Sequence, residues 1–167
     1  WFEVPSDVEP SEFADGLPRS ADPVVLRLGE TGGFYRVAKR GKQSQLEISA
    51  VVVCCHGGPG EDGSLQAMFD LAGVRYTGPS QSGAALGMDK LAFSGVMEAA
   101  GLSSLPLHLV SDDLLLNEVG PFIVKPRFGG SSIGIEIVEN LETANALVRT
   151  QPLLREGAVI QRYLSDA

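Results

Sequence analysis

Hydrophobic residues occur along the chain in short runs whose spacing alternates between that of strands and that of helices. Residues 50–55 form a nearly continuous apolar run rich in valine, which is typical of a strand buried on both faces. Residues 64–71 place apolar side chains three and four positions apart, which predicts a helix with one buried side. A short apolar stretch at 74–77 predicts a second strand. The order strand, loop, helix and strand favours a parallel βαβ unit.

The second half of the chain predicts a β-hairpin with a glycine-rich tip. Apolar residues at 121–125 and 135–138 form its two strands, and the segment 126–134 between them is rich in glycine and serine. The other predicted elements are strands at 23–28 and 33–37 joined at 29–33, helices at 81–87, 88–100 and 141–149, an edge strand at 105–110, a short helix or linker at 111–118, and a strand at 158–164. Residues 1–22 are polar and predict a loosely packed N-terminal segment. The pattern therefore predicts an α/β protein with a parallel sheet in its N-terminal part.

Composition and charge exclude several classes of protein. Hydrophobic residues make up 44% of the 167 residues and charged residues 20%, which is typical of a folded domain. The net charge of −8 argues against general nucleic-acid binding, because phosphate contacts need clustered lysine and arginine. No apolar run approaches the roughly 18 residues that a membrane-spanning helix needs, so no membrane partner is expected.

The two cysteines, Cys54 and Cys55, are adjacent and end the predicted strand at 50–55. Neighbouring side chains of a strand point to opposite faces, so these two thiols cannot readily bond to each other. We therefore expect two small buried core residues in a protein of the reducing cytoplasm. The first residues show no signal-peptide pattern, and the missing initiator methionine predicts a processed chain or part of a longer product.

Lysine is scarce after Lys42, where only Lys90 and Lys125 occur. Lys90 lies near the start of a predicted helix, and Lys125 ends an apolar strand beside the glycine-rich segment. A lysine in that position can act as a point charge on a phosphate, while main-chain N–H groups of the loop bind the oxygens. The alternative is a surface lysine beside an ordinary hairpin turn. No Gly-Lys-Ser/Thr sequence opens a helix, so this is not a Walker loop.

A second polar cluster follows the first predicted buried strand, in the sequence HGGPGEDG at residues 56–63. Ligands of α/β folds bind at the carboxyl ends of parallel strands, which makes His56 a candidate base or carboxylate-binding residue. His56 is also compatible with a structural role at the start of the next helix. Glu61 and Asp62 can instead favour the positive end of that helix. His108 lies between apolar residues and is expected to be a packed histidine.

Five sequence blocks in a common order resemble D-alanine–D-alanine ligases of the ATP-grasp superfamily. The blocks are HGGPGEDGSLQ at residues 56–66, Gly78, MDK at 88–90, IVKP at 123–126 and GSSIG at 130–134. The similarity covers roughly residues 50–164. It implies an N-terminal, substrate-side α/β domain with a parallel sheet (the pre-ATP-grasp domain) at 1–78. It further implies the first α+β half of an ATP-grasp clamp at 79–160, and the stub of a C-terminal domain at 161–167.

The resemblance implies roles for the residues of the first polar loop and for the two lysines. His56 would contact the carboxylate or the acyl phosphate of the first amino acid and is a candidate catalytic residue. Glu61 belongs to the same loop and would help to bind that substrate. Lys90 and Lys125 would bind the α- and β-phosphates of ATP.

The glycine-rich loop and the last strand are assigned to ATP by the same resemblance. The loop would close over the γ-phosphate, and Ser131 would hydrogen-bond in the closed state as a second candidate catalytic residue. The last strand would pair with adenine through its backbone, with Gln161 where the family usually has glutamate. The ATP-binding residues expected in these two segments are Gly130, Ser131, Ser132, Gly134, Gln161, Arg162 and Leu164.

The implied activity is the ATP-dependent joining of two amino acids, which supplies a dipeptide for peptidoglycan synthesis. ATP would phosphorylate one carboxylate, and the amine of the second amino acid would displace the phosphate. The cofactors would be ATP and Mg²⁺. The family's metal ligands lie in its C-terminal domain, and no metal ligand is predicted in this chain.

Several expectations limit this interpretation. Nothing in residues 1–49 matches the family's first substrate-binding segment, so the 167-residue chain alone is expected to be inactive. The resemblance suggests a homodimer formed through the N-terminal domain. Two alternatives stay open, namely an ATP-grasp ligase for a different carboxylate and amine, and a catalytically incomplete nucleotide-binding module.

Overall fold

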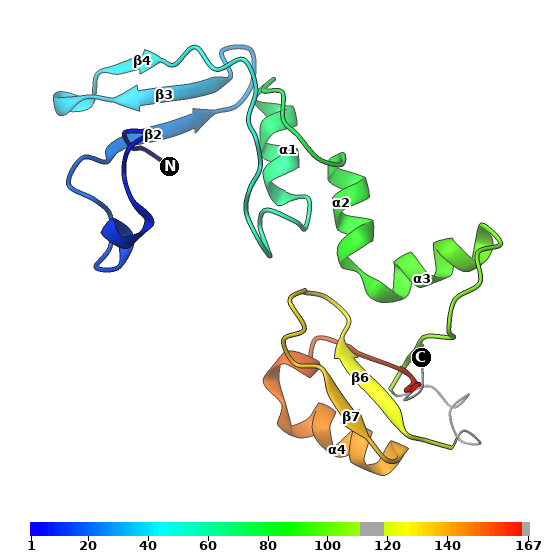
Figure 1. Ribbon diagram of the computed structural model, residues 1–167. Coiled ribbons are helices and arrows are strands. Elements are labelled where there is room, and N and C mark those ends of the chain that lie inside the picture. The colour runs from blue at the N-terminus through cyan, green and yellow to red at the C-terminus, as the bar shows by residue number, and fades with distance from the viewer. Residues whose placement is uncertain (111–118, 165–167) are drawn as a thin grey trace. The chain divides into compact units, whose positions relative to one another are not determined.

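The computed structural model describes residues 1–110 and 119–164 and forms two compact units (Figure 1). The first unit comprises Trp1–Cys54 and Ser64–Pro79, and the second comprises Cys55–Gly63 and Ser80–Ala167. The predicted short helix or linker at 111–118 lies outside the described residues, as do residues 165–167.

An antiparallel sheet dominates the first unit, with the strand order β1-β2-β3-β4. The strands are β1 (Phe2–Glu3), β2 (Asp22–Arg27), β3 (Gly33–Val37) and β4 (Gln43–Gln45), and two short 3₁₀ helices cover Pro10–Phe13 and Lys39–Gly41. The predicted hairpin between β2 and β3 is confirmed, with Val25 opposite Tyr35. The predicted helix at 64–71 is also confirmed, as α1 (Ser64–Leu71).

The core of the first unit forms where α1 packs on this sheet. Leu65 and Phe69 of α1 are buried in one cluster with Val24 and Phe34 of the sheet. The ring of Phe34 also lies 5.5 Å from that of Trp1, centroid to centroid. Because the helix uses positions i and i+4 for this contact, its apolar spacing in the sequence is explained by packing.

The parallel strand predicted at residues 50–55 is reduced to one parallel bridge, between Val51 and Tyr76. The partner stretch is short, and the N–H of Val53 donates to the side-chain oxygen of Thr77 (3.1 Å) rather than extending the ladder. Val52 is consequently 70% exposed. The expectation of buried cysteines is wrong for the same reason, since Cys54 and Cys55 are both exposed free thiols.

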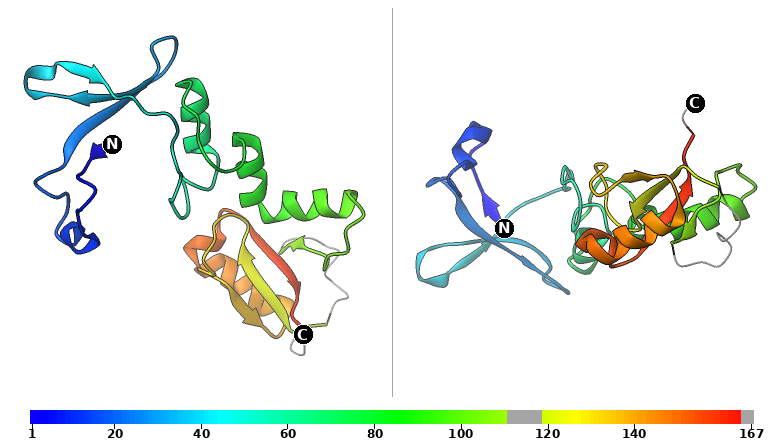
Figure 2. Two further views of the ribbon diagram at one scale, coloured as in Figure 1. Left: turned by 45° about the horizontal axis from the view of Figure 1, so that its top comes forward. Right: turned by 90° about the horizontal axis from the view of Figure 1, so that it is seen from below.

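A four-stranded antiparallel sheet with the order β5-β8-β6-β7 forms the second unit, and α4 lies against it (Figures 1 and 2). Its elements are α2 (Gln81–Met88), α3 (Lys90–Ala99), β5 (His108–Leu109), β6 (Phe122–Pro126), β7 (Glu136–Val138), α4 (Leu141–Thr150), a 3₁₀ helix at Pro152–Leu154, and β8 (Ala158–Arg162). The predicted hairpin with the glycine-rich tip is confirmed, with Val124 of β6 opposite Glu136 of β7.

Strand β6 separates the core from the candidate site. Phe122 and Val124 point into a buried cluster that includes Ala144 of α4 and Ile160 of β8. Successive side chains of a strand alternate between faces, so Lys125 projects from the opposite face to these core residues. The hydrophobic pattern of β6 therefore fixes the direction in which Lys125 points.

The predicted helix at 88–100 begins two residues later than expected. Asp89 has an extended backbone (φ −87°, ψ 97°) that separates α2 from α3. Its carboxylate accepts hydrogen bonds from the N–H groups of Leu91 and Ala92, which is the usual arrangement of a helix N-cap. The two separate helices predicted at 81–87 and 88–100 are therefore present, and their boundary lies at Asp89.

Candidate functional site

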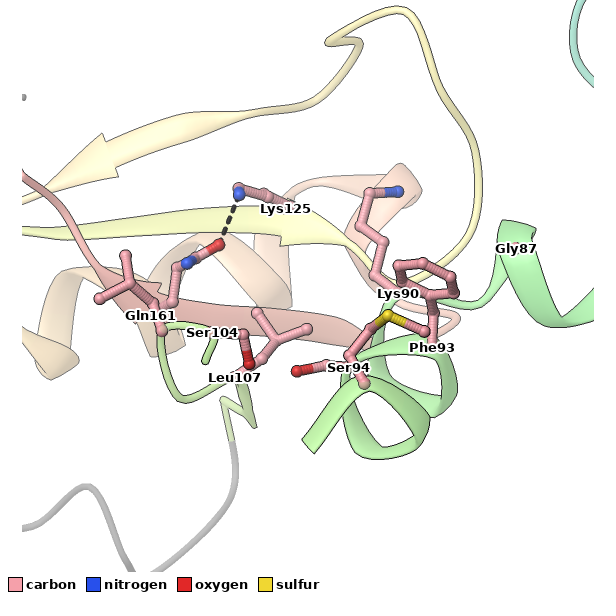
Figure 3. A pocket seen from close by; sticks show the side chains of 10 residues that line it. Gly87, Lys90, Phe93, Ser94, Ser104, Leu107, Lys125 and Gln161 are labelled. Carbon is pink, nitrogen blue, oxygen red and sulfur yellow. Dashed lines mark hydrogen bonds between the residues drawn. The ribbon is translucent and has the colours of Figure 1, made fainter. Parts of the chain in front are cut away.

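The two scarce lysines of the sequence line one cavity in the second unit (Figure 3). Lys90 is the first residue of α3, Lys125 lies on β6, and Gln161 lies beside them on β8. The ammonium group of Lys125 donates a hydrogen bond of 2.5 Å to Oε1 of Gln161. The cavity has a volume of about 340 Å³, so three elements distant in sequence present two cations and an amide to one space.

The remaining wall of the cavity is largely apolar and was missed by the sequence analysis. Phe93 and Met97 of α3 line it together with Leu105 and Leu107 of the following segment. The signal was present, because Lys90, Phe93 and Met97 lie at positions i, i+3 and i+7 on one helix face. An apolar slot with two ammonium groups suits a flat ligand that carries an anionic tail.

The electrostatics of the two lysines favour an anionic ligand. Burial lowers the pKa of Lys125, and burial followed by the charge of Lys125 lowers the pKa of Lys90. A lysine at the first position of a helix also meets the partial positive charge of the helix amino end. The positive charge of Lys90 therefore destabilises the folded protein at this position. An anion bound in the cavity would offset the repulsion between Lys90, Lys125 and the helix amino end.

The glycine-rich loop begins directly beside Lys90. The ammonium group of Lys90 donates to the carbonyl oxygen of Gly129 over 2.7 Å. Ser131 and Ser132 both have left-handed backbones, with φ values of 55° and 56°. Such a conformation costs a non-glycine residue about 1–2 kcal/mol, and backbone strain of this kind clusters at functional sites such as ligand-binding loops. Gly134 ends the loop with φ 74°, and Gly130 lies exposed at its centre.

The three residues predicted to bind ATP in and after the last strand lie at different places relative to the cavity. Gln161 lines the cavity and lies opposite Ile123 of β6. Arg162 is the last residue of β8, opposite Phe122, and its side chain is exposed. Leu164 follows the strand and is exposed as well. The structure therefore brings Gln161 to the lysines, while Arg162 and Leu164 continue the same chain segment beyond the cavity.

The loop at 56–63 holds His56 and Glu61 together. Nδ1 of His56 lies 3.7 Å from Oε1 of Glu61, and Oε2 of Glu61 accepts the N–H of Gly57 over 2.7 Å. The His56 side chain is 91% exposed, so it is available to a ligand. Gly60 packs against Cys55, since an added Cβ would lie 2.3 Å from the Cβ of Cys55. Glu61 is thus tied to the main chain, and the tight turn leaves His56 at the surface.

His108 lies half-buried in β5, opposite Ile160 of β8, which fits the packed histidine that we expected. In the part of the chain that the structure describes, no three His, Cys, Asp or Glu side chains gather closely enough to hold a metal ion. No role proposed below involves the metal. Nor does any described helix have the length and apolar character needed to cross a membrane.

Comparison with known proteins connects this geometry to one family. Residues 7–79 match the family model described as the D-ala D-ala ligase N-terminus. The D-alanine–D-alanine ligase of Corynebacterium aurimucosum is 39% identical over 81% of this chain, and that of Arthrobacter sp. is 36% identical over the whole chain.

A solved structure shows the same fold. The D-alanine–D-alanine ligase of Helicobacter pylori superposes on 95% of this chain with a TM-score of 0.78 and 23% identity. The chain spans 39% of the Corynebacterium relative, 50% of the Arthrobacter relative and 49% of the Helicobacter structure. Over the half of the ligase length that it spans, the chain is similar in sequence to D-alanine–D-alanine ligases and has the fold of a solved ligase structure.

Proposed function

We propose that this chain is the part of an ATP-dependent ligase that binds the nucleotide phosphates and the first amino acid. The whole protein would join two molecules of D-alanine through an acyl phosphate. The observation that carries the proposal is the convergence of Lys90 and Lys125 on one apolar cavity beside a glycine-rich loop. Similarity in sequence to these ligases supports the class of reaction.

In this proposal the two lysines bind successive phosphates, and the apolar wall of the cavity accepts the purine ring. Gln161, which lines the cavity, would lie at the base end of the site, and Arg162 and Leu164 would follow it along the chain. The loop from Gly130 to Gly134 supplies main-chain N–H groups, and Ser131 and Ser132 add hydroxyl groups, to the terminal phosphate. The residues then act by positioning and by charge, because phosphoryl transfer needs little covalent help from a protein.

The amino-acid site would include the loop at 56–63. His56 is exposed and lies beside Glu61, so its imidazole is placed to donate a hydrogen bond to the carboxylate that receives the phosphate. Glu61 would hold His56 and the turn in place through its bond to Gly57. The product would be a dipeptide for peptidoglycan, made in the cytoplasm, and the working unit would be a homodimer.

Two measurements test the proposal. Calorimetric titration of ATP into the chain should give saturable binding, whereas ADP release by the chain alone should not respond to amino acids. In the longer protein, a panel of amino acids with an ADP readout should show turnover with D-alanine. Turnover with a different carboxylate and amine, but not with D-alanine, would reassign the substrates. No ATP binding at all would overturn the nucleotide role.

The lowered lysine pKa values predict that ATP binding weakens at unusually mild alkaline pH. Burial lowers both pKa values from 10.5, so the ammonium groups begin to lose their protons below the range of exposed lysines. The triphosphate is fully charged above about pH 7.5, so only the protein titrates there. The dissociation constant should therefore begin to rise at a lower pH than it would with lysines of the ordinary pKa of 10.5. Lys90→Arg should flatten this profile, because arginine keeps its charge, and a flat wild-type profile would contradict the prediction.

Replacing His56 with alanine is expected to raise the KM for the first amino acid about tenfold or more in the longer protein, because a hydrogen bond to a charged carboxylate is lost. ATP affinity should be unchanged. Stability should change by less than about 0.5 kcal/mol, since the side chain is exposed. The matched control is His108→Ala, the chain's other histidine, which should leave the KM unchanged. An unaltered KM in His56→Ala would remove His56 from the substrate site.

A further inference from the structure

Asp89 connects two features of the second unit that the ligase roles above leave unexplained. Its extended backbone separates helix α2 from helix α3. Its carboxylate caps α3 by accepting hydrogen bonds from the N–H groups of Leu91 and Ala92. The same carboxylate also accepts two hydrogen bonds from Arg127, from Nε over 2.8 Å and from Nη2 over 2.6 Å. A helix N-cap needs only one acceptor oxygen, so the helix start does not account for the pairing of Asp89 with Arg127.

Arg127 lies just beyond β6, on the same face as Lys125. Only Pro126 lies between them, and side chains two positions apart in an extended strand point the same way. Asp89 and Lys90 are likewise adjacent at the start of α3. The ion pair between Asp89 and Arg127 therefore lies beside the cavity that Lys90 and Lys125 line.

Further main-chain contacts join the same segments. The N–H of Lys90 donates to the carbonyl oxygen of Arg127 (3.1 Å), and the N–H of Arg127 donates to the carbonyl of Gly157 (2.9 Å). The N–H of Gly129 lies 3.2 Å from the sulfur of Met88, immediately before Asp89. The start of α3, the end of β6 and Gly129 of the glycine-rich loop are thus held together by hydrogen bonds.

The pair is well shielded from solvent. The side chains of Asp89 and Arg127 are 15% and 32% exposed, whereas those of a second bidentate pair among the described residues, Glu3 with Arg36, are 40% and 44% exposed. Arg127 holds the pKa of Asp89 below its usual value, so the carboxylate is charged at neutral pH. A shielded, two-point contact fixes geometry better than an exposed pair does.

We propose that Asp89 and Arg127 are a positioning pair that sets the spacing between Lys90 and Lys125 for a polyphosphate ligand. The pair does not touch the ligand and acts through Lys90. This inference rests on the nucleotide role proposed above.

The test compares ATP with adenosine, which lacks the phosphates. Asp89→Asn keeps a good helix cap and nearly the same shape but loses the ion pair. Arg127→Gln removes the guanidinium, and Arg127→Lys keeps the charge without the two-point geometry. The dissociation constant for ATP should rise about tenfold in Asp89→Asn and Arg127→Gln, and less in Arg127→Lys. Adenosine affinity should change by less than about twofold.

Two controls isolate positioning from general loosening of the fold. Arg36→Gln breaks the equivalent bidentate pair in the first unit and should leave the affinity for ATP unchanged. In a Lys90→Ala background, Asp89→Asn should cause little additional loss, because the residue through which it acts is already gone. Circular dichroism and the melting temperature would show that the variants remain folded.

Four other results would each contradict the proposal for a different reason. Equal loss of ATP and adenosine binding in the Asp89 and Arg127 variants would mean a purely structural pair. Wild-type ATP affinity in those variants would mean that the lysine spacing does not depend on the pair. Full additivity with Lys90→Ala would show that Asp89 acts elsewhere. If the wild-type protein binds no ATP, the nucleotide role itself fails, and this inference fails with it.

Discussion

Replacing Lys125 with alanine is expected to weaken ATP binding about 100-fold. The ammonium group is half-buried, and burial already lowers its pKa, so its attraction for a phosphate is only weakly screened by water. The change also leaves Oε1 of Gln161 without the hydrogen bond that Lys125 donates. Calorimetric titration at low ionic strength measures the effect, with the melting temperature as a check on folding.

Two further variants serve as controls for Lys125→Ala. Lys42→Ala removes the same charge from an exposed position in the first unit and should leave the affinity unchanged. Lys125→Arg keeps the charge but replaces a compact ammonium group with a planar fork, so only partial recovery is expected. Binding by Lys125→Ala within about threefold of wild type would exclude Lys125 from the phosphate site.

Replacing Phe122 with alanine is expected to destabilise the second unit by about 3–5 kcal/mol, which is a large part of the stability of an ordinary domain. Phe122 is 1% exposed and belongs to the cluster behind β6. Its loss leaves a cavity beneath the strand that carries Lys125. Urea unfolding followed by far-UV circular dichroism should show the transition of the second unit at a lower urea concentration.

The sequence offers both a control and an independent probe for this experiment. Ile137 lies on the neighbouring strand β7 with 52% exposure, so Ile137→Ala should cost less than about 1 kcal/mol. Trp1 is the only tryptophan and packs against Phe34 and Phe69 of the first unit. Its fluorescence should therefore report an unchanged first unit in Phe122→Ala. Equal effects of the Phe122 and Ile137 variants would contradict the assigned core.

Local sequence signals predicted the elements whose structure depends on near neighbours. The helix at 64–71 and the hairpin around the glycine-rich loop occur where the apolar spacing and the glycines place them. Predicting that Lys90 and Lys125 converge required the family resemblance as well. The two lysines lie 35 positions apart, and no sequence periodicity links a helix start to a strand end. Their scarcity was nevertheless a useful signal in the sequence itself.

The failures of prediction all depend on contacts between distant residues. A valine-rich run indicates a strand only if a partner of equal length exists, and residues 50–55 have only the short stretch around Tyr76. The exposure of Cys54 and Cys55 follows from that lack. The boundary between the helices predicted at 81–87 and 88–100 was placed two residues too early, and the pair that Asp89 forms there with Arg127 joins residues far apart in the chain. Such pairings become visible only in three dimensions.

The division of the chain into two interleaved units has a consequence for synthesis and for excision. Residues 55–63 interrupt the sequence of the first unit, yet they belong to the second. During translation, the first unit cannot finish folding until residues 64–79 have left the ribosome, and the loop that carries His56 must then wait for the rest of its own unit. Neither unit can be cut out as one uninterrupted stretch. A fragment that starts at Ser80 would keep both lysines but lose the His56 loop, so it would separate the proposed nucleotide site from the proposed amino-acid site.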